Sequence, residues 1–198
     1  MKKGRLEAFS DGVVAIIITI MVLELKVPEH KNNIRDLLPM LPFFMSYVLS
    51  FVYVGIYWNN HHHMLYLVDS ITGGALWANL NLLFWLSLIP FVTEWMADND
   101  FAPWPVAAYG VALIMCAVAY TILYYVLASH CGENSVLAQT LGNDWKGKVS
   151  ILIYVMGVAL SFSHPYIACT MYGVVACIWF IPDRRVERHV MHHRKGNE

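Results

Sequence analysis

Long apolar runs separated by short polar joints dominate this sequence. A helix needs about 20 mainly apolar residues to cross a bilayer. By that measure the pattern predicts six membrane-spanning helices, at residues 6–25, 41–67, 71–96, 104–129, 149–162 and 165–181. The last two runs are short, and the proline at position 165 marks the start of the sixth helix. The expected fold class is an all-α membrane protein.

The distribution of Lys and Arg predicts how the chain lies in the membrane. With six spans both ends lie on one side, together with the basic residues Lys2, Lys3, Arg5, Lys146, Lys148 and those that follow Pro182. The other side holds only Lys26, Lys31 and Arg35. Because basic residues gather in cytoplasmic segments, both termini are expected in the cytoplasm. Residues 1–182 would form one six-helix transmembrane domain, and residues 183–198 a basic cytoplasmic tail.

Composition supports a multi-pass protein of the cell membrane. Hydrophobic residues make up 58% of the 198 positions and the mean hydropathy is +0.51, whereas soluble domains are about 45–50% apolar. The first apolar run is not expected to be a cleaved signal, because Glu24, Lys26 and Pro28 follow it in place of small residues. A net charge of −1 with 13 Lys and Arg argues against nucleic acid as a partner.

The first span has a polar start and one polar residue near its middle. Ser10 and Asp11 precede an apolar run over residues 13–23 whose single polar member is Thr19. At about 100° per residue, a stripe about 100° wide contains Ile16, Thr19, Ile20 and Leu23. Asp11 points about 140° away from Ile16, so it faces other neighbours. Such a stripe is typical of a helix packing seam and less often of a pore lining, and spacing alone leaves both readings open.

The second span closes on WNNHHHML, which contains His61, His62 and His63. Three consecutive residues turn through about 200° on a helix, so these side chains cannot all bind one metal ion. They are expected to form hydrogen bonds with neighbouring helices or to respond to pH.

The third span carries polar side chains in an apolar setting: Asn79, Asn81 and Ser87. Amides and hydroxyls in such places join helices to one another, at roughly 0.6–2 kcal/mol each. The tail contains His189, His192 and His193 at a spacing that suits a metal, although a basic helix resting on anionic lipid is the more typical reading.

No hydrolase, dinucleotide or phosphate-loop signature occurs in the sequence, and no buried pair of carboxylates can be named. We therefore expect neither an enzyme nor a bound metal or other cofactor.

The stretch RLEAFSDGVVAIIITIMVLEL resembles the Arg-x-x-x-Phe-Ser-Asp signature that opens the first helix of the transmembrane protein 175 family of potassium channels. Arg5, Phe9, Ser10 and Asp11 match that signature. YWNNHHHML and LWANLNLLFWLSLIPF resemble the family's second and third helices, so the motifs cover residues 5–90. The resemblance implies that members of this length contain one six-helix repeat and assemble as homotetramers. The resemblance implies a tetrameric channel in which four copies of the first helix line the pore.

Carried onto this chain, the resemblance implies a pore lined by Ile16, Thr19, Ile20 and Leu23, with Ile16 as the narrow apolar ring. The polar start of the helix would bond sideways to the other two motifs and hold the helix in place. The expected polar network comprises Arg5, Phe9, Ser10, Asp11, His61, His62, His63 and Asn79. Arg5 lies within about 20° of the direction of Ile16 and is expected to turn outward or to pair with an acid such as Glu7.

The leading reading is a potassium-permeable, voltage-independent cation channel, with potassium ions, the lipid bilayer and three further copies of the chain as partners. A proton or non-selective cation leak through the same pore is one alternative. A membrane enzyme or metal carrier built on the histidine clusters is an alternative of another class.

Overall fold

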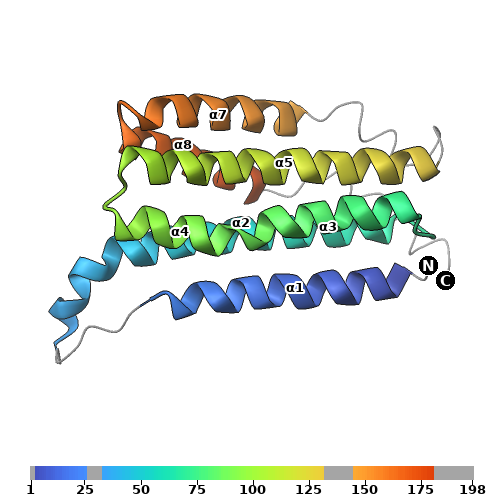
Figure 1. Ribbon diagram of the computed structural model, residues 1–198, viewed down its shortest axis with the longest axis horizontal. Coiled ribbons are helices and arrows are strands. Elements are labelled where there is room, and N and C mark those ends of the chain that lie inside the picture. The colour runs from blue at the N-terminus through green and yellow to red at the C-terminus, as the bar shows by residue number, and fades with distance from the viewer. Residues whose placement is uncertain (1–2, 26–32, 132–144, 181–198) are drawn as a thin grey trace.

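The protein is a bundle of helices that run roughly parallel or antiparallel to one long axis (Figure 1). The computed structural model describes residues 3–25, 33–131 and 145–180, and every regular element within these ranges is helical. The helices, in chain order, are α1 (Lys3–Leu23), η1 (Ile34–Met40), α2 (Leu41–Tyr66), α3 (Gly73–Ser87), α4 (Ile89–Asp98), α5 (Pro103–Cys131), α7 (Trp145–Ser161) and α8 (Pro165–Phe180). The predicted tail, with its three histidines, lies outside the described residues.

Each predicted span coincides with a helix except the third, which is divided into α3 and α4. The division follows from Pro90, the second residue of α4, which has no backbone N–H to donate to the preceding turn. Leu88 at the joint instead bonds through its N–H to the Trp85 carbonyl, 3.2 Å away. The predicted span at residues 71–96 thus consists of two consecutive helices, α3 and α4, which together form one apolar segment long enough to cross a membrane.

Four segments in the described part of the chain are long and apolar enough to cross a membrane, at residues 3–23, 34–66, 73–98 and 103–131. The helices α7 and α8 have 17 and 16 residues. At 1.5 Å per residue they reach about 24–26 Å, a little less than the hydrocarbon thickness of about 30 Å.

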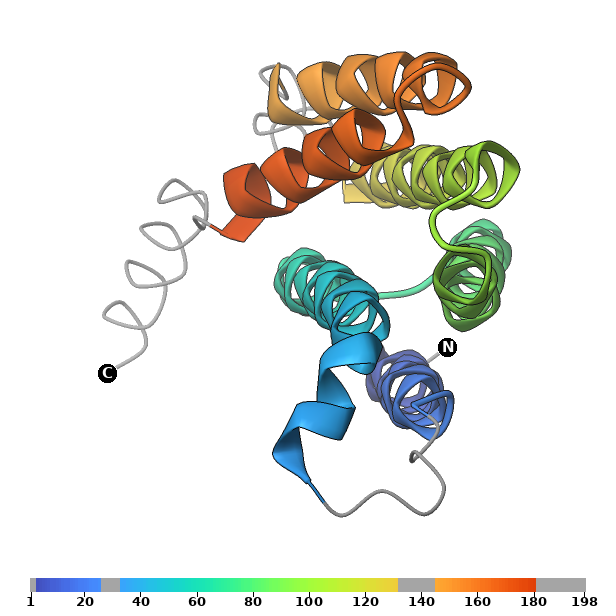
Figure 2. The same cartoon turned by 90° about the vertical axis from the view of Figure 1, so that its left-hand side faces the viewer.

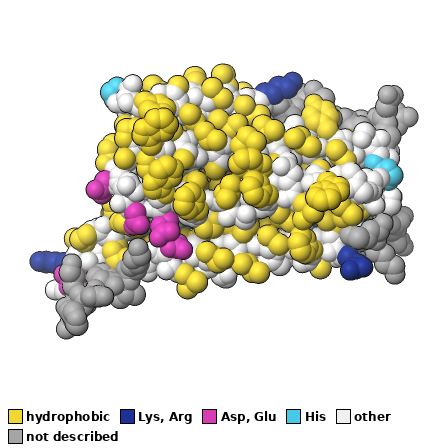
Figure 3. Space-filling view, in the orientation of Figure 1, with side chains coloured by type: hydrophobic (Ala, Val, Ile, Leu, Met, Phe, Trp, Pro, Cys, Tyr) yellow, Lys and Arg dark blue, Asp and Glu magenta, His cyan; other side chains and the backbone are white. Residues whose placement is uncertain are grey.

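Hydrophobic side chains cover the face of the molecule seen in Figure 3, and charged side chains gather toward its two ends. Large apolar residues such as Trp77, Phe91 and Tyr166 are 61–75% exposed. A soluble protein rarely exposes so much contiguous apolar surface. In a bilayer this surface faces lipid, so the arrangement is that of a multi-pass membrane protein.

Seen end-on, α1 lies at one edge of the bundle and α7 at the opposite edge (Figure 2). Among the residues that the structure describes, α1 packs mainly against one side, formed by α2, α3 and α4. At the other edge α5, α7 and α8 pack closely against one another. The bundle therefore leaves much of α1 uncovered.

Glycines allow the close approach of α5, α7 and α8. Tyr172 of α8 is fully buried, and its ring lies against Gly110 of α5 and Gly157 of α7. Its hydroxyl donates to the Val106 carbonyl at 3.4 Å. In lipid, small residues of this kind let helix backbones come near enough for van der Waals packing to hold them.

We predict that Gly157→Ala destabilises the bundle by about 1–3 kcal/mol, because overpacking a buried contact costs that much. The added Cβ would lie 2.5 Å from Tyr172 Cε1. Thermal unfolding in detergent measures the change. Gly173→Ala is the matched control, since nothing lies within 4 Å of a Cβ there. Equal unfolding temperatures for the two variants would contradict the close packing of Tyr172.

Candidate functional site

The inner face of α1 is a regular stripe of buried residues. Its members recur every three or four positions, as one face of a helix requires: Leu6, Ser10, Val14, Ile17 and Met21. All are at most 5% exposed. Because this stripe packs on α2, α3 and α4, it determines which side of α1 is turned away from the bundle.

The four residues predicted to line a pore all lie on the outward side of α1. Ile16 is 58% exposed, Ile20 42% and Leu23 76%, and Thr19 is also exposed. Their own chain therefore does not use them as a packing seam. In a membrane this surface faces lipid or another copy of the chain.

The hydroxyl of Thr19 is oriented by its own helix. Thr19 Oγ1 lies 3.0 Å from the carbonyl oxygens of both Ala15 and Ile16. Its single hydrogen is donated to one of these carbonyls, which leaves the lone pairs of the oxygen on the outward side. Thr19 therefore presents an acceptor oxygen at this surface, which is the type of ligand that a cation binds.

Three buried polar side chains join α1, α2 and α3. Asn79 Nδ2 donates to Ser10 Oγ at 3.0 Å, and Asn79 Oδ1 lies 2.7 Å from His61 Nε2. Because Oδ1 can only accept, His61 carries its proton on Nε2 and donates it. Ser10 is 1% exposed, Asn79 0% and His61 6%, so the chain of hydrogen bonds is shielded from water and lipid.

Asp11 has a partner that sequence reasoning missed. Trp58 Nε1 donates to Asp11 Oδ1 at 2.8 Å, and the Trp58 ring stacks on His62 with centroids 6.3 Å apart. The expected partners of Asp11 were the three histidines and Asn79. Trp58 lies three residues before His61 and is therefore on a neighbouring part of the helix surface, so the helical spacing could have indicated it.

The histidines of α2 point in different directions, as their consecutive positions require. His61 is buried, His62 exposed and His63 half-buried, and the last two touch only ring to ring, with centroids 6.0 Å apart. Among the residues that the structure describes, no three His, Cys, Asp or Glu side chains are grouped as metal ligands would be.

Arg5 and Phe9 do not join the buried network. Phe9 is 52% exposed, and it lies seven residues before Ile16, which places it within about 20° of that residue around the helix. Arg5 is exposed on the same side, and its side chain makes no ion pair with a described residue. Glu7, the acid considered for Arg5, lies 4.0 Å from Lys3 instead. The position of Phe9, seven residues before Ile16, already indicated that Phe9 faces the outward side of α1.

Comparison with known proteins identifies the family of this chain. Residues 5–90 match the family described as endosomal/lysosomal potassium channel TMEM175. A potassium channel of Chryseobacterium sp. (strain P1-3) is 58% identical to the chain over 188 residues, which cover 95% of this chain and 97% of that protein. The chain belongs to the TMEM175 family. The resemblance of the first three helices to that family is thus confirmed.

The fold is shared with a solved member of the TMEM175 family. The crystal structure of a lysosomal potassium-selective channel TMEM175 homolog from Chamaesiphon minutus superposes with a TM-score of 0.79 at 28% identity, and the match covers 90% of this chain and 96% of that one. TMEM175 of Gallus gallus, named an endosomal/lysosomal proton channel, is 34% identical over 94 residues, which cover 42% of this chain and 18% of the relative. The chain is therefore a membrane protein of an ion-channel family.

We predict that Asn79→Leu lowers the stability of the protein by several kcal/mol. It leaves buried groups of Ser10 and His61 unpaired, at about 1–3 kcal/mol each. Asn81→Leu is the matched control on the same helix, because the Asn81 side chain is only half-buried and bonds to no other residue that the structure describes. Thermal unfolding in detergent compares the two. An unfolding temperature of Asn79→Leu equal to that of Asn81→Leu would mean that the network does not hold α1.

Proposed function

We propose that the protein is a potassium-permeable, voltage-independent cation channel in which α1 helices of four copies line a central pore. The observation that carries the proposal is the exposed stripe of Ile16, Thr19, Ile20 and Leu23 on the outward side of α1. In an ion-channel family, a helix that keeps a hydroxyl such as that of Thr19 on an uncovered apolar face is a natural pore lining.

The need for several copies follows from the position of α1. One chain supplies a single stripe of this kind at the edge of the bundle, and one stripe cannot enclose a pore (Figure 2). Beside the stripe a groove of about 550 Å³ runs between α1 and α4, with Ile16, Ile20 and Phe91 among its lining residues. Such a groove would receive side chains of the neighbouring α1.

In the proposed topology α7 and α8 also cross the membrane, which gives six crossings and both termini in the cytoplasm. The close packing of α7 against α5 and against α8 supports this assignment, because both shorter helices lie beside the half of α5 that follows α4 (Figure 1). Residues 1–182 would then form the channel domain and residues 183–198 a basic cytoplasmic tail.

Ile16 and Thr19 would have different tasks in this pore. A ring of isoleucine side chains offers no ligand, so it passes ions only when it is wide enough to retain water, and it closes by dewetting. Thr19, one turn further along, would present a ring of acceptor oxygens to a partly dehydrated ion. Oxygen ligands replace the water of a large, weakly hydrated ion more readily than that of sodium, which would favour potassium.

A proton or non-selective cation leak through the same stripe is the second candidate. The name of the animal relative, a proton channel, favours it. An enzyme or metal carrier built on the histidines has less support, because His61 is already bonded to Asn79 and the ring of His62 to Trp58 by stacking. Reversal potentials in opposed potassium, sodium and pH gradients distinguish the three ions.

We predict that the protein is a homotetramer in detergent that preserves conduction. Mass measurement by light scattering, corrected for bound detergent, or native mass spectrometry should give four times the 22.6 kDa of the chain. A stable monomer in preparations that conduct after reconstitution would contradict the proposed pore.

We predict that Ile16→Asn and Thr19→Val alter the channel in different ways in planar bilayers. Ile16→Asn should raise the current several-fold, because an amide ring wets the constriction. Thr19→Val should lower the K⁺/Na⁺ permeability ratio by about fivefold, which corresponds to about 1 kcal/mol for the lost oxygen ligands.

Each variant has a matched control. Thr170→Val removes a hydroxyl that is also exposed and bonded to its own helix, 2.9 Å from the Tyr166 carbonyl, but on α8. Val22→Asn adds an amide to the exposed surface of α1 about 120° around the helix from Ile16. If the two α1 variants change current and permeability ratio no more than their controls, the stripe does not line the pore.

A further inference from the structure

An aromatic ridge follows the exposed side of α3 and α4. It consists of Trp77, Phe84 and Phe91, which recur every seven residues, about two helical turns, and are 75%, 56% and 61% exposed. The indole N–H of Trp77 donates to no residue that the structure describes. In a single chain this ridge would lie against lipid. It therefore presents bulky rings and, at one end, a hydrogen-bond donor to whatever lies beside the chain.

The exposed side of α2 has the opposite shape. No atom lies within 4 Å of the place that a Cβ would take at Gly55, and the described part of the chain gives no packing reason for a glycine in the middle of this helix. Asn59, one turn further along, is exposed, and its amide bonds to no described residue. An unpaired amide is unfavourable among lipid chains, and in membrane spans such a side chain typically bonds to a neighbouring helix. This side of α2 thus offers a notch and a polar group that lipid chains do not satisfy.

Two hydrogen bonds fix the relative levels of α2 and α3 along the bundle axis. Trp58 of α2 donates to Asp11 at 2.8 Å, and Asn79 of α3 donates to Ser10 at 3.0 Å. Because Ser10 and Asp11 are consecutive residues of α1, Trp58 and Asn79 lie at nearly the same level. From that level α2 and α3 run in opposite directions (Figure 1).

The ridge and the notch therefore lie at the same level. At about 1.5 Å per residue, Gly55 lies about 4.5 Å and Phe84 about 7.5 Å toward the end of the bundle where α4 ends. Asn59 and Trp77 lie about 1.5 Å and 3 Å in the other direction. A bulky ring thus matches the level of the notch, and an indole N–H matches the level of an unpaired amide.

The two surfaces lie on opposite sides of α1. Seen end-on, α2 lies on one side of α1 and α4 on the other (Figure 2). When copies of the chain surround an axis that α1 faces, the α4 side of each copy is turned to the α2 side of the next, and such a contact between unlike surfaces can close into a ring. We propose that the ridge packs on α2 of the next copy, with Phe84 over Gly55 of the partner subunit and the Trp77 N–H donated to Asn59 Oδ1 of the partner subunit.

This inference rests on the proposed arrangement of copies around α1 and specifies the contact between neighbours. The groove of about 550 Å³ beside the ridge is lined by Glu24, Ser87 and Glu94 as well as by apolar residues. Carboxylates within membrane spans face protein or water in preference to lipid tails. The α4 side of the chain therefore also favours a protein neighbour over lipid.

Disulfide formation between copies tests the contact. In a chain whose four native cysteines are replaced by alanine, Phe84→Cys together with Gly55→Cys should give covalent dimers, trimers and tetramers on oxidation in membranes, because each copy supplies one thiol to each of its two neighbours. Each substitution alone should give no covalent species. Leu152→Cys in place of Gly55→Cys is the matched control, since Leu152 is 58% exposed on α7, at the opposite edge of the bundle (Figure 2).

The outcomes separate this contact from the proposed function. Cross-linking no stronger with Gly55→Cys than with Leu152→Cys, in preparations that are tetrameric by native mass spectrometry, would overturn the contact and leave the proposed function intact. Covalent dimers from Gly55→Cys alone would show a twofold contact between like surfaces and would also overturn it. Preparations without any tetramer would overturn the proposed function and this contact with it.

A double-mutant cycle tests the hydrogen bond between copies. Trp77→Phe and Asn59→Leu should each weaken assembly in liposomes about threefold per contact, as expected for one interhelical hydrogen bond in a membrane. The double variant should assemble no more weakly than either single variant, because both remove the same bond. Energy transfer between labelled copies at increasing lipid-to-protein ratio measures assembly, and Tyr125→Phe, 55% exposed on α5, is the control that should change nothing. Effects that multiply in the double variant would show that Trp77 and Asn59 do not meet.

Discussion

One buried chain of hydrogen bonds fixes the rotation of α1, and the arrangement of the outward stripe depends on it. Ser10, Asn79 and His61 join three helices at a depth where neither water nor lipid can satisfy their polar atoms. A rotation of α1 by one residue would move Ser10 by about 100° and leave the Ser10 hydroxyl and the Asn79 amide N–H unpaired. Ile16, about 120° around the helix from Ser10, is thereby held on the outward side.

A second set of polar contacts holds the rest of the bundle. The Ser50 hydroxyl lies 2.7 Å from that of Thr93 and 3.0 Å from that of Tyr109, so it joins α2 to α4 and α5. Between helices in lipid there is little hydrophobic driving force, and such bonds together with small-residue packing carry the association. Both sets include α2, which thus joins α1 and α3 through one set and α4 and α5 through the other.

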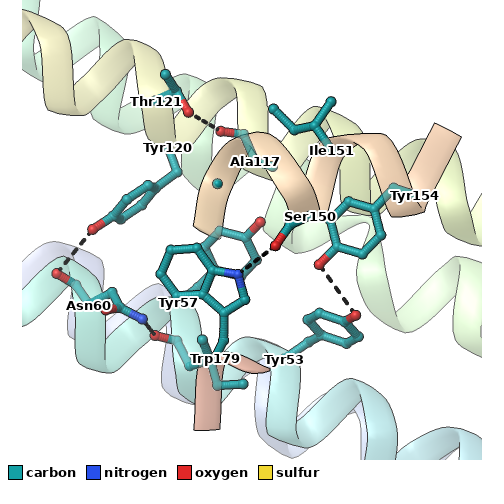
Figure 4. Close-up of a pocket in the computed structure, with 12 residues that line it drawn as sticks. Tyr53, Tyr57, Asn60, Ala117, Tyr120, Thr121, Ser150, Ile151, Tyr154 and Trp179 are labelled. Carbon is teal, nitrogen blue, oxygen red and sulfur yellow. Dashed lines mark hydrogen bonds between the residues drawn. The ribbon is translucent and has the colours of Figure 1, made fainter. Parts of the chain in front are cut away.

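The position of α2 gives its last turns two separate environments. One side bonds to Asp11 of α1 through Trp58 and to Asn79 of α3 through His61. The other side, with Tyr57 and Asn60, lines a small aromatic cavity between α2, α5, α7 and α8 (Figure 4). This division follows from the helical repeat, because neighbours in sequence point about 100° apart. A displacement of α2 would therefore affect both sides together.

The sequence by itself determined the helical class, the extent of the apolar segments and the stripe on α1. These depend on length and on a period of 3.6 residues, which are local properties of the chain. The position of Phe9 on the outward side was also available from the spacing. The break before Pro90 follows from a single residue, but whether a proline bends or divides a helix depends on what packs around it. Only the tertiary structure decided which polar groups meet: Asn79 with Ser10, 69 residues apart, Trp58 with Asp11, 47 apart, and His61 with Asn79, 18 apart. No local rule selects such partners, because each polar group has several chemically suitable ones and the packing of the helices determines which comes within reach.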